Sequence, residues 1–168
     1  TGASLHYMEI KPDAGDLVAQ TSVPILGDDT AHEVFQKVTV AAEITLVRAL
    51  PQLIAGTAAR VPMDLKSGSY FSGRKPEDGR IDWSQPAQAV YNLVRAVAPP
   101  YPGAFADIDG TRVIVNKAKV SLARTSTPVG SVQRAGQTLG FCCGDGNLLV
   151  PLSLTVNNER LVGATLKK

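Results

Sequence analysis

The segment TGASLHYMEIKPDAGDLVAQ, at residues 1–20, holds the residues whose types and spacing could support chemistry. An Asp-Ala-Gly-Asp turn, Asp13 to Asp16, stands there between two strand-like stretches. A carboxylate on a tight turn can orient a histidine, stabilise its charged form or hold a water for proton transfer. The exposed backbone N–H and C=O groups of the turn can also hydrogen-bond a planar heterocycle. The same residues fit a structural Asx-turn with Gly15 at a left-handed corner, and spacing alone favours that structural interpretation.

Few other residues have the pattern of a reactive or metal-binding site. Cys142 and Cys143 are adjacent in the sequence, so they are poorly placed for an ordinary disulfide and lack the spacing of zinc ligands. We interpret them as buried strand thiols in a reducing compartment and expect no metal site. His6 lies in the strand before the turn and His32 in the first turn of a helix, and we expect neither to be catalytic.

Composition and charge describe an ordinary globular protein. Hydrophobic residues make up 44% of the 168 residues and charged residues 19%. The net charge of +2 is too small to indicate nucleic acid binding by itself. No apolar run approaches the roughly 18 residues that span a bilayer. We therefore expect a soluble, cytoplasmic protein without membrane insertion.

Two strands and a long helix are expected to position the turn. Residues 3–8 and 17–24 have strand-like composition on either side of it. Thr30 and Glu33 then form a capping box at the start of a helix whose apolar residues recur at helical spacing. Pro51 should kink this helix or begin a new turn, and Gly56 should end it.

The composition changes after the long helix. Residues 57–82 are dense in Gly, Pro and charge and predict a linker with a short strand near 59–62. A second helix is expected after Trp83, with Ser84 as its cap and Pro86 in its first turn. From residue 104 onward, turn signals at 109–110 and 144–146 separate short strands, which predicts a small antiparallel barrel.

The predicted fold class is therefore α/β plus β. Residues 1–57 form the end of an α/β domain, residues 58–82 a linker, and residues 83–168 a helix with a small β-barrel. The chain has no initiator Met and opens directly on strand-like sequence, so we expect it to be a fragment of a longer protein.

Several motifs together resemble the folate-dependent formyltransferases. They follow the order of that family along almost the whole chain: the segment 1–20, GDDTAHEVF, Leu50-Pro51, GRKPEDGRIDW at 73–83, NLVRAVAPPYPGAF at 92–105 and CGDGNL at 143–148. The resemblance implies the C-terminal remnant of a Rossmann-like catalytic domain, followed by an OB-like barrel.

The resemblance also implies a donor, a reaction and a set of site residues. Asp13 matches the family's catalytic aspartate, and its loop matches the one that contacts the pterin ring of 10-formyltetrahydrofolate, here Ile10, Lys11, Pro12, Ala14, Gly15 and Asp16. The implied reaction is attack of a substrate amine on the formyl carbon, through a tetrahedral intermediate. The family's Asn-x-His motif lies upstream of the position that matches Thr1. The whole protein is thus expected to be an enzyme, and this chain alone to be inactive.

The acceptor is inferred from finer resemblance. The residues around the turn, the linker and the second helix are most similar to sugar-nucleotide formyltransferases, nearest to those that act on UDP-4-amino-4-deoxy-L-arabinose in lipid A modification. Arg74 aligns with an arginine of these enzymes whose fork could engage a phosphate or carboxylate, although it could equally be a solvated linker charge.

Two alternatives stay open at this point. Methionyl-tRNA formyltransferases have the same architecture, with a barrel that helps to hold tRNA, and would need a coherent basic face. Several basic residues could supply one: Arg112, Lys117, Lys119, Arg124, Arg134, Arg160, Lys167 and Lys168. The chain could also be a non-catalytic binding module.

Overall fold

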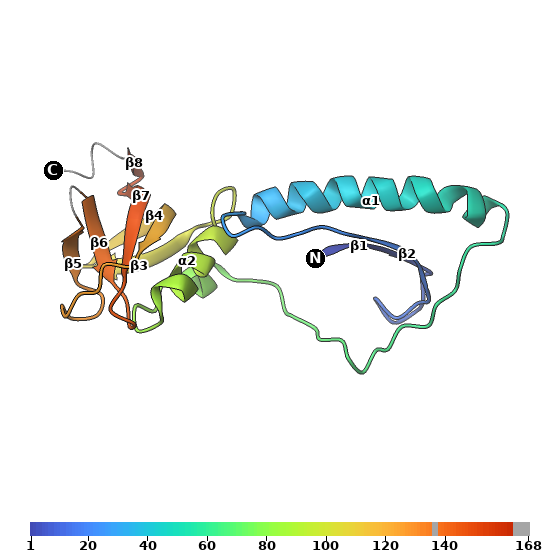
Figure 1. Cartoon of the computed structure of the whole chain (residues 1–168), viewed down its shortest axis with the longest axis horizontal. Coiled ribbons are helices and arrows are strands. Elements are labelled where there is room, and N and C mark those ends of the chain that lie inside the picture. The colour runs from blue at the N-terminus through green and yellow to red at the C-terminus, as the bar shows by residue number, and fades with distance from the viewer. Residues whose placement is uncertain (136–137, 163–168) are drawn as a thin grey trace. The chain divides into compact units, whose positions relative to one another are not determined.

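The computed structural model describes residues 1–135 and 138–162 (Figure 1). Two compact units make up the chain, one of residues 1–29 and 33–73 and the other of residues 30–32 and 74–168. The domain boundaries expected at residues 57 and 82 stay predictions. No helix in the described part of the chain is long and apolar enough to cross a membrane.

The first unit is a β-hairpin with one long helix. Strands β1 (Gly2–His6) and β2 (Leu17–Ser22) pair antiparallel, with Gly2 opposite Ser22 and His6 opposite Leu17. Helix α1 (Ala31–Ile54) runs along the hairpin (Figure 1). Its buried residues are small and four apart, namely Ala41, Thr45 and Ala49. Small side chains at this spacing let a helix approach a strand closely, and Thr45 Oγ1 donates a hydrogen bond to Thr21 Oγ1 at 2.7 Å.

Helix α1 continues through Pro51 to Ile54, so of the two expected effects of Pro51 the new turn is wrong, and the kink stays a prediction. A proline removes a single backbone donor, and the surrounding turns can still hold the helix. The predicted end is confirmed: Gly56 has a φ of +69°, and the N–H of Thr57 donates to the carbonyl of Gln52 at 2.9 Å. This is the left-handed helix end that glycine favours. The predicted capping box at the start of α1 stays a prediction.

In the second unit, the 3-10 turn η1 (Pro76–Gly79) precedes helix α2 (Ala87–Ala96), whose start differs from the prediction. Ser84 does not cap the helix, because its hydroxyl donates to Asp82 Oδ1 at 2.6 Å. Pro86 stands at the N-cap rather than in the first turn. The backbone N–H of Ala87 instead donates to Asp145 Oδ1 at 3.2 Å. A carboxylate from a distant β-turn therefore supplies the cap.

All strands of the second unit pair antiparallel, as expected. They are β3 (Ala104–Ile108), β4 (Thr111–Ser121), β5 (Val132–Ala135), β6 (Thr138–Cys142), β7 (Leu148–Val156) and β8 (Glu159–Val162). Their order in the sheet is β3-β4-β7-β6-β5, and β8 pairs with β7 as well. Both predicted hairpins are confirmed: β3 and β4 join through Asp109 and Gly110, which have positive φ, and β6 and β7 pair around Gly144–Gly146.

One face of this curled sheet packs under α2. Val90 and Val94 of the helix are almost fully buried against β-strand residues that include Val115, Leu149 and Leu154. Among the described pairings, β3 and β5 lie at opposite ends of the sheet. The antiparallel sheet is thus established, whereas its closure into an OB-like barrel and the Rossmann-like origin of the first unit stay predictions.

Candidate functional site

The hairpin β1–β2 presents the predicted turn at the end of a ten-residue loop, residues 7–16. The backbone N–H of Tyr7 donates to the carbonyl of Asp16 at 2.9 Å and closes the base of this loop. Nδ1 of His6 lies 2.8 Å from the carbonyl oxygen of Tyr7. Because a carbonyl oxygen only accepts, a hydrogen bond here requires the hydrogen on Nδ1. We call residues 7–16 the hairpin loop.

Asp13, not Gly15, adopts the left-handed conformation in this loop. The φ of Asp13 is +56°, and aspartate tolerates this region better than most residues. The predicted left-handed corner at Gly15 is therefore wrong. Glycine is required there for a different reason: a Cβ at Gly15 would lie 1.7 Å from the carbonyl oxygen of Tyr7. The loop packs so tightly on its own base that only a residue without a side chain fits.

The Asp13 side chain is 78% exposed, and the described contacts place one basic side chain, that of His6, near its carboxylate. His6 Nε2 lies 3.8 Å from Asp13 Oδ1. The sequence indicated no role for His6, because the residues beside it match no catalytic motif. The alternation of strand β1 could have placed its side chain on the loop side, but nothing local indicated the contact with Asp13.

The other predicted loop residues lie together but differ in exposure. Ile10 is fully exposed, as is Met8 beside it, so the loop presents two apolar side chains to solvent. Lys11 Nζ lies 5.7 Å from the centre of the Tyr70 ring. Within residues 1–135 and 138–162 no group of three His, Cys, Asp or Glu residues could hold a metal ion. The loop thus presents exposed apolar side chains beside a lysine that lies near an aromatic ring.

Part of the predicted linker contacts the base of the hairpin loop. Val61 and Leu17 exchange two backbone hydrogen bonds, of 2.8 and 3.0 Å, so the strand expected near 59–62 is a single β-bridge. The guanidinium of Arg60 lies 3.7 Å from the centre of the Tyr7 ring. Arg60 Nη1 is also 3.6 Å from Asp16 Oδ2. Sequence reasoning missed these contacts, because composition alone described the segment as a connector.

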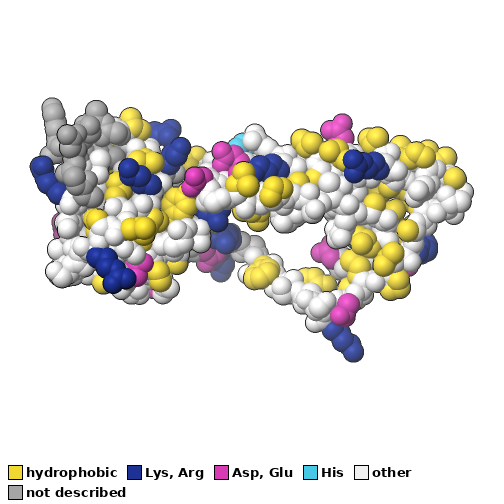
Figure 2. Space-filling model, viewed as in Figure 1, with side chains coloured by type: hydrophobic (Ala, Val, Ile, Leu, Met, Phe, Trp, Pro, Cys, Tyr) yellow, Lys and Arg dark blue, Asp and Glu magenta, His cyan; other side chains and the backbone are white. Residues whose placement is uncertain are grey.

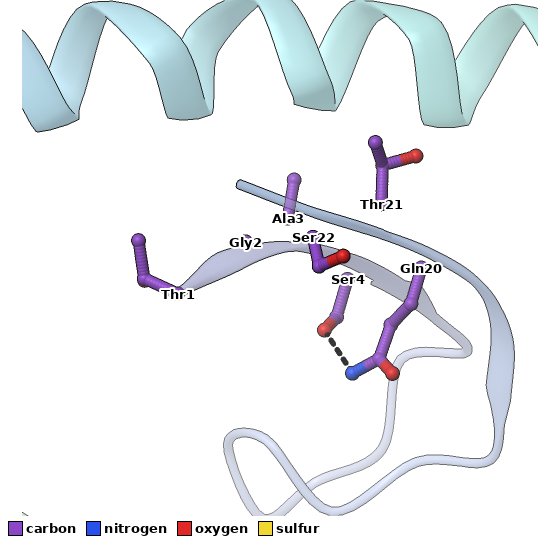
Figure 3. Close-up of a pocket in the computed structure, with 7 residues that line it drawn as sticks. All are labelled: Thr1, Gly2, Ala3, Ser4, Gln20, Thr21 and Ser22. Carbon is purple, nitrogen blue, oxygen red and sulfur yellow. Dashed lines mark hydrogen bonds between the residues drawn. The ribbon is translucent and has the colours of Figure 1, made fainter. Parts of the chain in front are cut away.

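A hollow of about 340 Å³ lies over the hairpin, and Figure 3 shows its lining. It is formed by the first four residues and by the end of β2: Thr1, Gly2, Ala3, Ser4, Gln20, Thr21 and Ser22. Ala3 and Thr21 point towards α1, whereas Ser4 and Gln20 point away from it and share a 2.7 Å hydrogen bond (Figure 3). No acidic or imidazole side chain lines this hollow, so it lacks a general acid or base. None of the predicted site residues belongs to it.

The second unit contributes one predicted site residue, Arg74, which is exposed. Its proposed contact with substrate stays a prediction. A different cluster in this unit is well defined: Arg80 and Arg112 both lie over the Phe105 ring and both approach Asp107. Hydrogen bonds from Arg112 and then Arg80 lower the pKa of Asp107 below its ordinary value. The single carboxylate of Asp107 thus engages both guanidinium groups and offsets one of their two positive charges.

The two cysteines are buried and free, as the sequence indicated. Burial raises the pKa of the Cys143 thiol to about 11. A thiol with this pKa is almost entirely protonated near neutral pH, and the thiolate is the reactive form. Cys143 therefore has the properties of a packing residue.

Residues 74–165 match the family model described as formyl transferase, C-terminal domain. HypX from Aquifex aeolicus superposes with a TM-score of 0.69 at 20% identity, over 96% of this chain and 29% of HypX. An N-formyltransferase from Helicobacter canadensis, in complex with folinic acid and dTDP-3-aminofucose, has a TM-score of 0.68 at 18% identity, over 88% of this chain and 54% of its own.

A methionyl-tRNA formyltransferase from Clostridium thermocellum is also similar. It has a TM-score of 0.56 at 21% identity, over 72% of this chain and 51% of its own. The chain thus spans less than a third of HypX and about half of the other two proteins. At these identities the superpositions establish a shared fold.

Proposed function

The chain belongs to the family of formyl transferase C-terminal domains, which are parts of enzymes, and we propose that the whole protein transfers a formyl group from 10-formyltetrahydrofolate to an amine. In the balanced reaction, a bond forms between the amine nitrogen and the formyl carbon, and the bond from that carbon to N10 of the donor breaks. One proton moves from the amine to N10. The products are a formamide and tetrahydrofolate, and the step requires neither a metal nor a redox cofactor.

The geometry of the hairpin loop is the observation that carries this proposal. Its carboxylate, Asp13, is exposed in a strained left-handed conformation, and strain of this kind is common at functional sites. Met8 and Ile10 of the same loop expose apolar side chains to solvent, and apolar surface of this kind could contact a pterin ring. Folinic acid in the Helicobacter protein and tetrahydrofolic acid in HypX support a folate donor.

In the proposed site the loop residues bind and orient, and Asp13 handles protons. Ile10, Lys11, Pro12, Ala14, Gly15 and Asp16 would hold the pterin ring through backbone groups and apolar contact. Asp13 would accept a proton, or stabilise a protonated histidine, as negative charge develops on the formyl oxygen. The resemblance assigns the asparagine and the histidine of this reaction to an upstream Asn-x-His motif.

We infer that the acceptor is a sugar nucleotide of the UDP-4-amino-4-deoxy-L-arabinose type. The sugar N-formyltransferase from Helicobacter aligns with 88% of this chain, whereas the methionyl-tRNA formyltransferase aligns with 72%. Arg74 would bind a phosphate of the nucleotide, since an arginine fork matches phosphate geometry. One observation favours tRNA instead: Arg112, Lys117 and Lys119 are all exposed along strand β4.

Formylation of each acceptor by the whole protein tests the proposal. The purified protein is incubated with 10-formyltetrahydrofolate and either UDP-4-amino-4-deoxy-L-arabinose or initiator methionyl-tRNA, and tetrahydrofolate release is followed. We expect turnover with the sugar nucleotide. Turnover with tRNA alone would refute the proposed acceptor, and binding of either acceptor without turnover would favour a non-catalytic module.

A further inference from the structure

The structure assigns a role to Arg60 that the predicted linker did not indicate. We propose that Arg60 is a positioning residue, which holds the hairpin loop in its donor-binding form from outside the loop. This inference rests on the proposed function of the loop, and Arg60 is not among the residues proposed to contact the donor.

Arg60 reaches both ends of the hairpin loop at once. Its guanidinium lies 3.7 Å from the centre of the Tyr7 ring, at the start of the loop. Its Nη1 lies 3.6 Å from Asp16 Oδ2, at the end. Tyr7 and Asp16 are the two residues whose backbone groups close the loop by their 2.9 Å hydrogen bond. A single side chain therefore spans the closure of the loop.

The backbone next to Arg60 is held by hydrogen bonds, so the side chain extends to the loop from a fixed position. Val61 exchanges two backbone hydrogen bonds with Leu17, the first residue after the loop. An anchored residue loses less conformational entropy when its side chain makes a contact. The guanidinium also places a positive charge over an aromatic face, which a neutral side chain of similar length cannot reproduce.

The affinity for the donor depends on the fraction of molecules in which the loop is closed. The carbonyl of Tyr7 also contacts His6 and packs against Gly15, so a shift of Tyr7 also disturbs His6, whose Nε2 lies 3.8 Å from Asp13 Oδ1. If only part of the molecules has the closed loop, the apparent Kd of the donor rises by the inverse of that fraction. At a saturating donor concentration, binding returns nearly all molecules to the closed loop, so the rate at saturation is restored. Loss of Arg60 should thus raise the KM for the donor and leave kcat and the KM for the acceptor unchanged.

Arg60→Gln in the whole protein, with Arg48→Gln as control, tests this role. Arg48 is another exposed arginine, on helix α1. The first measurement is amide hydrogen exchange of Tyr7, Leu17 and Val61 without any ligand. The second is the Kd of folinic acid, and the third is the KM for 10-formyltetrahydrofolate. We expect Arg60→Gln to speed the exchange and to raise the Kd and KM about five- to tenfold, the scale of one exposed cation–π contact and one surface ion pair.

The outcomes separate this inference from the proposed function. Arg60→Lys, which keeps the cation, should recover part of the loss. Exchange and folinic acid binding unchanged in Arg60→Gln would overturn the role of Arg60. A fall in kcat at constant KM would also overturn it, because that result indicates a smaller folded fraction. If the unmodified protein bound no folinic acid, the proposed function would fail, and the exchange rates would still decide whether Arg60 holds the loop.

Discussion

Replacement of Gly15 by alanine should open the hairpin loop without unfolding the protein. The φ of Gly15 lies outside the left-handed region that favours glycine, so the backbone conformation does not exclude alanine at this position. The obstacle is steric: the new Cβ would lie 1.7 Å from the carbonyl oxygen of Tyr7, half of the 3.4 Å at which ordinary contacts begin. That atom is backbone, so the base of the loop must move.

The movement breaks two hydrogen bonds that define the closed loop. One runs from His6 Nδ1 to the carbonyl of Tyr7, at 2.8 Å, and the other from the N–H of Tyr7 to the carbonyl of Asp16, at 2.9 Å. At a net value of about 1 kcal/mol each, their loss costs about 2 kcal/mol. Because about 1.4 kcal/mol corresponds to a tenfold change in Kd, donor binding should weaken about 30-fold.

Titration of the whole protein with folinic acid, followed by tryptophan fluorescence or calorimetry, measures this effect. Gly27→Ala is the matched control, since nothing lies within 4 Å of a Cβ built at Gly27. The control should bind folinic acid as the unmodified protein does. If Gly15→Ala bound folinic acid with a Kd within twofold of that of Gly27→Ala, the expected steric effect would be refuted, because the loop could then close in another conformation.

Three further predictions follow from the site and its supporting structure. Asp13→Asn should lower the formylation rate by about 10²- to 10⁴-fold, the usual contribution of a general acid or base, with the Kd of folinic acid changed only a few-fold. Asp145→Ala should lower the free energy of unfolding of the second unit by about 1 kcal/mol in urea, because the N–H of Ala87 loses its cap. In the unmodified protein, burial raises the pKa of Asp145, but hydrogen bonds from Asn147 and the Ala87 N–H outweigh it, so the folded pKa lies below 3.8. The contribution of Asp145 is therefore complete above pH 3.8 and is lost as the pH falls through the folded value; equal stability losses for the variant at low and neutral pH would contradict it. Cys143, with a pKa of about 11, should not react with a thiol reagent at pH 8 until denaturant is added, and labelling of the native protein would show that the site opens.

The elements that could be predicted are those whose signals are local. The Asp109-Gly110 pair between two alternating stretches specified a hairpin, because both positions need positive φ. The apolar spacing of α1 and α2 specified helices that pack by one face. In each case the residues that carry the signal are neighbours in the sequence, and no distant contact had to be known.

The start of α2 could not be predicted in the same way. Ser84 has the right type and spacing for a cap, but its hydroxyl is engaged by Asp82, which also accepts from the Ser84 N–H at 2.9 Å. The actual cap, Asp145, comes from the turn between β6 and β7. A local rule identifies residues that can cap a helix, whereas the folded sheet decides which carboxylate reaches it.

The exposed surface of α1 shows a second limit of local rules. Periodicity predicted a helix but not how much of its circumference is covered. Phe35, Val47 and Ile54 are exposed, and Figure 2 shows hydrophobic side chains gathered over this helix. The hairpin covers only the stripe of small residues around Thr45. The periodic signal reports which residues are apolar, and the partner of each apolar face has to come from the fold.

The candidate site depends both on a local sequence motif and on contacts that only the folded chain brings together. A non-glycine residue with positive φ, such as Asp13, persists where its surroundings hold it, since the conformation costs free energy. Gly15, in the turn motif, packs against the carbonyl of Tyr7, the residue that follows strand β1 and closes the loop. Arg60, which lies over the Tyr7 ring, comes more than forty positions later in a segment whose composition indicated only a connector. A motif therefore identifies the carboxylate that could react, whereas the contact of Arg60 with the loop depends on the pairing of Leu17 with Val61, which brings the connector to the loop.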